Sequence, residues 1–128
     1  MILLDENIVV EQATVLRHRR VHFRHVGHDF SRQGIQDDNI IPLLHRLPRP
    51  TLFTRDLGLY RPRFCHPNYC IACLDVDELD VADFVRIFLR APRFATVARR
   101  LGWVARVSPG GVRAWQRHQK SEIFIPLP

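Results

Sequence analysis

The chain has 128 residues and a formal net charge of +6, which is enough for one domain with a single core and leaves an excess of basic side chains. A hydrophobic content of 46% and a charged content of 25% are typical of a folded globular protein and exclude an intrinsically disordered one. No apolar run approaches the roughly 20 residues of a membrane span, and the first residues lack the basic segment of a signal peptide. We therefore expect a cytoplasmic protein without a membrane partner.

The first half of the chain alternates between strand and helix patterns. Residues 2–4 form a short apolar run typical of a buried strand, and helical spacing follows over 9–16. Residues 21–26 alternate apolar with basic side chains, as a second strand would. After a polar loop, a helix is expected to begin at Asp37 and Asp38 and to carry an apolar stripe as far as Leu47.

The second half continues this alternation and ends in a hairpin. Residues 51–54 and 69–74 are predicted strands, and 78–89 and 94–101 are predicted helices. Two apolar segments flank Ser-Pro-Gly-Gly at 108–111, which predicts an antiparallel hairpin. Alternating strands and helices favour a mainly parallel sheet with helices on both faces.

Acidic side chains follow two of the predicted parallel strands. Asp5 comes directly after residues 2–4, and Asp56 comes two residues after 51–54. Because parallel strands end at the same edge of a sheet, both carboxylates are expected there, and Asp37 or Asp38 could face the same edge. Crowded carboxylates suit a hard cation such as Mg²⁺ or Mn²⁺, which activates water against a phosphate. The alternative is that each acid only caps a helix or a turn.

Three segments carry a resemblance to a known family. Leu-Leu-Asp-Glu-Asn at 3–7, Gly-Ile-Gln-Asp-Asp-Asn-Ile-Ile at 34–41 and Phe-Thr-Arg-Asp at 53–56 resemble small PIN-like proteins related to the toxin ribonucleases of bacterial toxin–antitoxin modules. The resemblance implies a three-layer α/β/α sandwich with a mainly parallel central sheet and a C-terminal hairpin. It implies one PIN-like domain over residues 1–115, with 116–128 as a C-terminal tail.

The resemblance also implies roles for individual side chains. Asp5 and Asp56 match the two strand-end acids, and Asp37 matches the mid-chain acid, with Asp38 as its close substitute. These acids would bind Mg²⁺ or Mn²⁺ and cleave RNA. The supporting residues that the resemblance and the spacing indicate are Glu6, Asn7, Thr54 and Arg55, the last as a phosphate contact.

The chain departs from the family pattern at two places. The family usually carries a further acid on a helix after the first strand, for which Glu6 and Glu11 are the candidates here. The family often has a second aspartate two residues after the Thr-Arg-Asp acid, where this chain has Gly58. A poorer acidic cluster would bind metal less tightly, so these departures weaken the prediction of catalysis more than the prediction of the fold.

Two other residue groups invite a different chemistry. Cys65, His66, Cys70 and Cys73 resemble part of a zinc site, but the second pair of ligands is missing and Cys70 and Cys73 fall on opposite faces of a strand. The seven histidines are spread over several elements and favour a solvated basic face, with His45 and His66 as candidates for substrate contact.

Arginine dominates the basic residues. Arg17, Arg19, Arg20 and Arg24 form one cluster in the sequence, and the forked guanidinium group suits phosphate. We therefore predict that this cluster binds nucleic acid, with a solvated helix face or a docking site for an acidic partner as the alternatives.

These observations predict a metal-dependent ribonuclease that acts on RNA, and the resemblance implies the toxin of a toxin–antitoxin module as a candidate role. The resemblance adds an antitoxin protein and a second copy of the chain as partners. The alternative is a module that has lost catalysis and binds nucleic acid or a protein.

Overall fold

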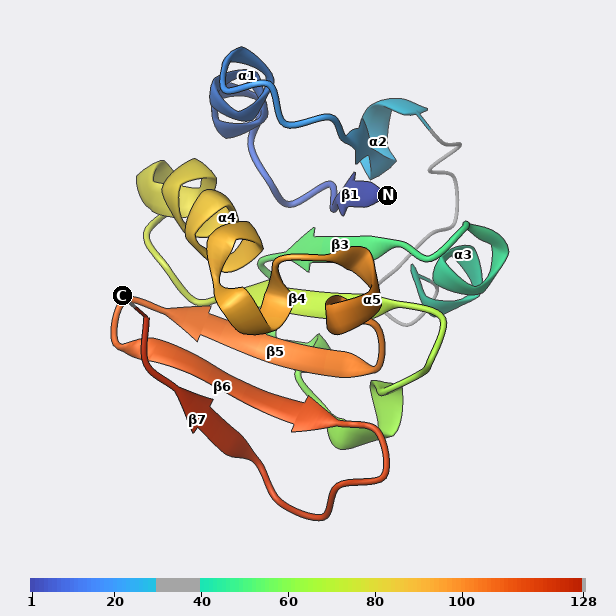
Figure 1. Cartoon of the computed structure of the whole chain (residues 1–128). Helices are drawn as coiled ribbons and strands as arrows, with labels where there is room; N and C mark the ends of the chain where they lie inside the picture. The colour runs from blue at the N-terminus through green and yellow to red at the C-terminus, as the bar shows by residue number, and fades with distance from the viewer. Residues whose placement is uncertain (30–39, 128) are drawn as a thin grey trace.

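The computed structural model describes residues 1–29 and 40–127, and in this part of the chain one mixed sheet holds the fold together (Figure 1). Its strand order is β2-β1-β3-β4-β5-β6-β7. The strands are β1 (Ile2–Leu4), β2 (Arg24–His25), β3 (Thr51–Thr54), β4 (Cys70–Leu74), β5 (Trp103–Ser108), β6 (Gly111–Gln116) and β7 (Ile123–Ile125).

The predicted three-layer sandwich with a mainly parallel sheet is wrong, because the C-terminal part of the sheet is antiparallel. Strands β2, β1, β3, β4 and β5 pair in parallel, whereas β5, β6 and β7 pair antiparallel. The hairpin expected around 108–111 is present as β5 and β6. Part of the segment predicted as a C-terminal tail pairs with β6 as the strand β7. Antiparallel neighbours need no crossover helix, so these strands add sheet without adding a helical layer.

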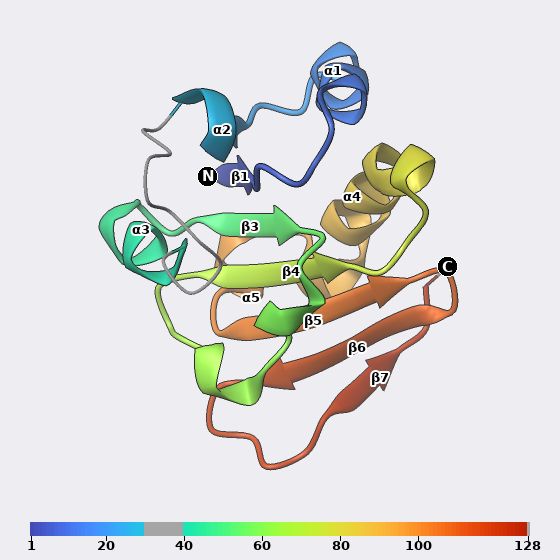
Figure 2. The ribbon, with the colours of Figure 1, turned by 180° about the vertical axis from the view of Figure 1, so that it is seen from behind.

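The two faces of the sheet are covered differently. One face carries α1 (Val10–His18), α4 (Val81–Arg90) and the short α5 (Val97–Arg100) (Figure 1). The other face carries α2 (Val26–Asp29) and α3 (Ile40–Arg46) (Figure 2). Beyond α3 this second face is covered by a loop with the 3₁₀ turns η2 (Leu57–Leu59) and η3 (Pro62–Phe64). The remaining 3₁₀ turns, η4 (Glu78–Asp80) and η5 (Pro92–Phe94), flank α4.

The core on the α1–α4 face is built from aromatic side chains of separate elements. The ring of Phe88 on α4 lies 5.7 Å from that of Phe53 on β3 and 4.4 Å from that of Phe94 in η5. Phe94 in turn meets Trp103 edge to face at 5.7 Å. Such contacts contribute beyond the burial of apolar area and fix α4 against the sheet.

Helix α1 ends in a tight cap that places an arginine in the left-handed region. The N–H of Val21 donates to the carbonyl of Leu16 at 3.0 Å, and that of Arg20 donates to the carbonyl of Arg17 at 3.0 Å. This is a Schellman pattern, in which the residue at Arg20 usually is glycine. The φ angle of Arg20 is +63°, which brings its Cβ close to the following carbonyl.

Replacing Arg20 with glycine should therefore stabilise the fold. Glycine removes the steric cost of the left-handed conformation but gains flexibility in the unfolded chain, so we expect a net increase of up to about 1 kcal/mol in the free energy of unfolding. Urea denaturation measures the change. Arg20→Ala keeps the Cβ and should not gain this stability. A glycine variant that unfolds at lower urea than the wild type would contradict the assignment of strain.

Candidate functional site

Two of the predicted acids, Asp5 and Asp56, lie at the edge of the sheet where β1 and β3 end. These two strands are parallel neighbours with Leu4 opposite Phe53, and the N–H of Asp5 continues the ladder by donating to the carbonyl of Phe53 at 2.9 Å. Asp5 therefore stands directly beside Thr54, the last residue of β3. Asp56 follows two residues later. The sheet thus brings Asp5 and the start of the Arg55–Asp56 segment to one edge.

The hydroxyl of Thr54 links the parts of this edge. It donates to Oδ2 of Asp5 at 2.7 Å, accepts from Nδ2 of Asn7 at 3.2 Å and accepts from the backbone N–H of Asp56 at 3.0 Å. Thr54 is fully buried and Asp5 is 9% exposed, so water cannot easily replace these bonds. Oδ1 of Asp5 accepts from the N–H of Glu6 at 2.8 Å. The Asp5 carboxylate is consequently held in one orientation.

Asn7 and Arg55 fasten the two strand-end loops to each other. Oδ1 of Asn7 accepts from the backbone N–H of Arg55 at 2.9 Å, so the Asn7 amide contacts both Thr54 and Arg55. The Arg55 side chain donates through Nη2 to the carbonyl of Val76 at 2.9 Å, and within the described residues its buried Nε has no hydrogen-bond partner. Arg55 is thus engaged with the backbone after β4, while its predicted contact with phosphate stays a prediction.

Asp56 caps a turn, which is one of the two roles that the sequence predicts for it as alternatives. Its Oδ1 accepts from the N–H of Gly58 at 2.9 Å and caps η2. A Cβ at Gly58 would lie only 2.9 Å from that same oxygen, so a side chain there requires the carboxylate to shift. The capping interpretation therefore holds for one carboxylate oxygen of Asp56. The position of Asp56 at the end of β3 remains the one that the metal-site interpretation requires.

The pKa of the Cys73 thiol is affected by the carboxylates at this edge of the sheet. Cys73 pairs with Thr54 in the register of β3 and β4 and is fully buried. Burial raises the pKa of the Cys73 thiol, and the negative charges of Asp56 and Asp5 raise that pKa further. Both carboxylates therefore act on the same point at the end of the neighbouring strand.

The donor set fits a hard divalent cation only in part. Two carboxylates with a neighbouring hydroxyl and amide are oxygen donors of the type that Mg²⁺ and Mn²⁺ prefer, and Mg²⁺ sites often use one or two protein carboxylates. Across residues 1–29 and 40–127, no group of three His, Cys, Asp or Glu side chains is placed to bind a metal ion. Asp37 and Asp38, the predicted third acid, lie outside the described residues. Glu6 and Glu11 are both exposed.

Sequence reasoning missed an ion pair at the same edge. Arg106 on β5 is the register partner of Cys73, and its guanidinium donates through Nη2 and Nε to Oδ2 of Asp75 at 2.7 and 3.2 Å. Asp75 directly follows β4, as Asp5 directly follows β1. The sequence does show a further acid, Asp75, after a predicted strand. The pairing of Asp75 with Arg106 depends on the register between β4 and β5, which the sequence alone does not reveal.

The other metal-ligand candidates lie elsewhere. Cys70 and Cys73 belong to different faces of the sheet, and burial raises the pKa of the Cys70 thiol to about 12, so it stays protonated. His45 and His66 meet edge to face at 4.4 Å beside Tyr69. His45 belongs to the last turn of α3 and His66 precedes β4, at the opposite edge of the sheet from Asp5. In this arrangement the two histidines are distant from the acids.

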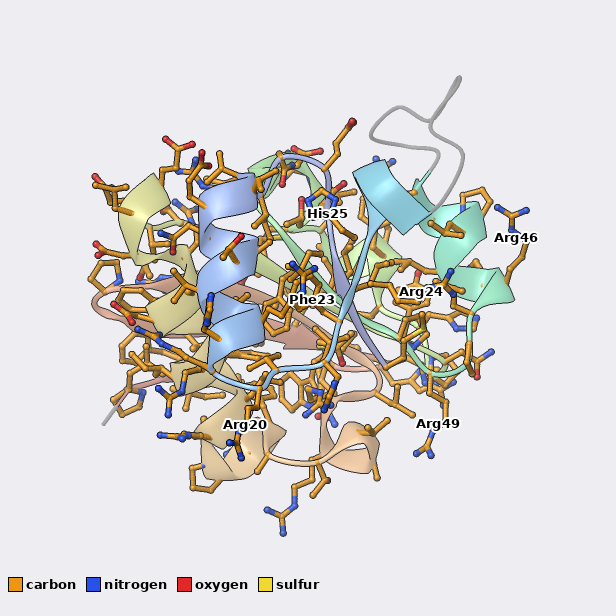
Figure 3. The ribbon with its side chains drawn as sticks, turned by 90° about the horizontal axis from the view of Figure 1, so that it is seen from above. Arg20, Phe23, Arg24, His25, Arg46 and Arg49 are labelled. Atoms are coloured by element: carbon orange, nitrogen blue, oxygen red, sulfur yellow. The ribbon has the colours of Figure 1, made fainter. Side chains whose placement is uncertain are left out.

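The four arginines predicted to bind nucleic acid do not act as one group. Arg19 pairs with Asp83 of α4 at 2.7 Å, and the guanidinium of Arg17 lies 5.1 Å from the centre of the Phe23 ring. Arg20 and Arg24 are exposed on the surface shown in Figure 3. Two arginines of other elements, Arg46 and Arg49, are labelled on that surface too.

Comparisons with known proteins do not identify a relative: no family model matches the chain, and no curated protein and no solved structure is significantly similar to it. In the part of the chain that the structure describes, no helix combines the length and apolar character needed to cross a membrane. The assignment of function therefore depends on the residues of the site.

Proposed function

We propose that the protein is a cytoplasmic, divalent-metal-dependent ribonuclease whose site is centred on Asp5, Thr54 and Asp56. The observation that supports it is the buried Thr54 hydroxyl, which joins the Asp5 carboxylate to the backbone of Asp56 across two parallel strands. A carboxylate that a buried hydroxyl holds in one orientation at a strand end is a fixed oxygen donor, which is the type of ligand that a hard divalent cation prefers.

Each side chain of the site has a distinct part in the proposed reaction. Asp5 and Asp56 would bind Mg²⁺ or Mn²⁺, with Asp37 or Asp38 as a further ligand. The bound metal supplies a nucleophile from water and polarises the phosphate of the RNA. Thr54 and Asn7 hold the Asp5 carboxylate and the Arg55–Asp56 backbone in register, so the acids need little rearrangement on binding.

The resemblance to PIN-like proteins supports the same chemistry. Of the residues that carry it, Asp5, Asn7, Thr54 and Asp56 lie at one edge of the sheet, whereas Asp37 and Asp38 lie outside the described residues. The proposal therefore includes a relationship to PIN-like proteins, and that relationship rests on the residues of the site. A role as a toxin, an antitoxin partner and a homodimer stay predictions.

Metal binding can be tested without any RNA. A ligand present at 100 times its Kd stabilises the native state by about 2.7 kcal/mol, so saturating Mn²⁺ should raise the melting temperature of the wild type by several degrees. Asp56→Asn should lose most of this shift. Asp80→Asn is the matched control, because Asp80 makes no side-chain cap bond at α4. Equal shifts in both variants would count against the site.

The alternative function is a module that binds nucleic acid without cleaving it. The observation that favours it is the lack of three metal-ligand side chains together within residues 1–29 and 40–127. The two functions differ in one result: such a module binds RNA in EDTA and leaves it intact when Mn²⁺ is added.

A further inference from the structure

Three exposed arginines share one side of the molecule, and within residues 1–29 and 40–127 no carboxylate pairs with them. Arg20 follows α1, Arg46 ends α3 and Arg49 precedes β3 (Figure 3). Among the described residues none of the three forms an ion pair. Arg19, Arg106 and Arg113 are each paired with a carboxylate, at 2.7, 2.7 and 3.4 Å. We call Arg20, Arg46 and Arg49 the amino-edge arginines.

The topology explains why these arginines gather. Arg20 lies in the turn before β2 and Arg49 in the turn before β3, and these strands flank β1 on its two sides. Neighbouring strands are about 4.8 Å apart, so β2 and β3 begin roughly 10 Å apart across β1, at the edge where the parallel strands begin. Arg46 closes α3 three residues before Arg49. The acids of the site lie at the opposite edge, where β1 and β3 end.

Arg24 connects this surface with the site. It is exposed on the edge strand β2 and is the register partner of Leu3, two residues before Asp5. Figure 3 shows Arg24 on the same side of the molecule as Arg46 and Arg49. Basic side chains thus run from the beginning of the parallel strands toward the end of β1.

Two of the amino-edge arginines hold a backbone conformation that a side chain disfavours. The φ angles of Arg20 and Arg49 are +63° and +50°. The third non-glycine residue with a positive φ in the described chain is His118, at +69°, which follows β6 at the same edge of the sheet. Glycine would adopt these conformations without strain. Strained residues that are kept although a simpler residue would fit are often functional, and the property that arginine adds here is its charge.

The surroundings favour a polyanion over a protein as the partner. Protein interfaces are centred on buried apolar or aromatic anchors. The large hydrophobic side chains exposed in the described chain are Val10, Leu79 and Phe124, and none of them lies in α3 or in the turns before β2 and β3. Forked guanidinium groups without a partner suit phosphate oxygens.

We propose that Arg20, Arg46 and Arg49 bind backbone phosphates of a single-stranded RNA that passes the open edge of β2 and reaches Asp5 and Thr54. This inference rests on the proposed ribonuclease function for the identity of the polyanion. The arginines position the RNA by its backbone and do not read its bases.

Binding of a labelled single-stranded RNA of 12 nucleotides to the full chain in EDTA tests the inference by fluorescence anisotropy. Each phosphate contact lowers the logarithm of the affinity by about 0.7 per tenfold rise in salt for single strands. Arg20→Gly should therefore bind about 5-fold more weakly than the wild type at about 0.1 M salt, with a salt slope reduced by about 0.7. Arg20→Gly/Arg49→Gly should lose about twice that slope.

This experiment separates binding from folding because the two effects have opposite signs. Arg20→Gly is the more stable protein, so weaker binding by it cannot come from partial unfolding. Arg20→Lys keeps the charge and should retain the affinity and the salt slope. Arg90→Gln is the control, because Arg90 is an exposed arginine on α4, across the sheet from α3.

Several results would overturn the inference. They are unchanged affinity and slope in the double glycine variant, an equal loss in Arg90→Gln, or wild-type protein that does not bind the RNA at all. A duplex RNA of the same sequence that binds as tightly as the single strand would overturn the single-stranded specificity. Since the assay contains no metal, a binding loss in the glycine variants supports the surface even if no cleavage is ever found. Cleavage by wild type and glycine variants with equal KM would retain the nuclease and reject the surface.

Discussion

Asp5→Asn should lower metal-dependent cleavage of RNA by about 100-fold or more. Even residues that only orient a metal ligand change activity by about 10- to 100-fold, and Asp5 is proposed as a ligand itself. Asparagine has nearly the same shape and keeps an acceptor for the N–H of Glu6, while its amide nitrogen takes the place of the oxygen that accepts from the Thr54 hydroxyl. It therefore removes the negative charge beside Thr54 together with one hydrogen-bond acceptor. Single-turnover cleavage of labelled single-stranded RNA in Mn²⁺ measures the loss.

The matched control for this change is Asp80→Asn, which removes one exposed carboxylate at the start of α4. It should cleave at the wild-type rate. Both variants should unfold cooperatively, which a thermal melt checks. Cleavage by Asp5→Asn within a factor of two of the wild type would remove Asp5 from the proposed site, whatever the wild-type activity.

Thr54→Val should be the most destabilising conservative change at the site, with a loss of about 2–4 kcal/mol in the free energy of unfolding. Valine has the volume of threonine but no hydroxyl, so the Asp5 carboxylate, the Asn7 amide and the N–H of Asp56 each lose a partner. The first of these groups is buried and pays the largest desolvation cost. Urea denaturation measures the change.

Thr54→Ser is the control, because serine keeps the hydroxyl and gives up only a methyl group. We expect it to lose no more than about 1.5 kcal/mol, typical of a buried methyl deletion. A valine variant that unfolds at the same urea concentration as the wild type would show that the three hydrogen bonds of Thr54 contribute nothing measurable. The link between the strand ends would then have to be sought elsewhere.

The elements with strong local patterns were predictable. Residues 51–54 and 70–74 are nearly continuous apolar segments and became β3 and β4, and the turn at 108–111 became the β5–β6 hairpin. The predicted second strand shortened to Arg24–His25, because the cap at Arg20 keeps the chain out of the sheet and Val26 already begins α2. The local sequence therefore predicted that this strand exists but did not predict its length.

The overall sheet was not predictable from the same patterns. Residues 123–125 have three apolar side chains and no turn signal of their own, and their place as β7 depends on pairing with β6. This antiparallel extension is what makes the sheet mixed. The ion pair of Arg19 with Asp83 joins residues 64 positions apart, so no local sequence pattern predicts it.

The candidate site was predictable to the level of residue type and strand end. Asp5 and Asp56 follow apolar strands, and parallel pairing then places them at one edge. The role of Thr54 as the link between the strand ends was not predictable. It depends on the exact register between β1 and β3 and on the Asn7 side chain from another loop. Asp37 and Asp38 lie outside the described residues, so their place at this edge stays a prediction.

The most direct test of the account is whether the wild-type protein cleaves RNA in a metal-dependent way. Purified protein is incubated with labelled single-stranded RNA in Mn²⁺, in Mg²⁺ or in EDTA, and the products are separated by size. The account predicts internal cleavage in Mn²⁺ or Mg²⁺ and none in EDTA. RNA that stays intact in all three conditions, while the same preparation binds it, would contradict the nuclease and leave a binding module.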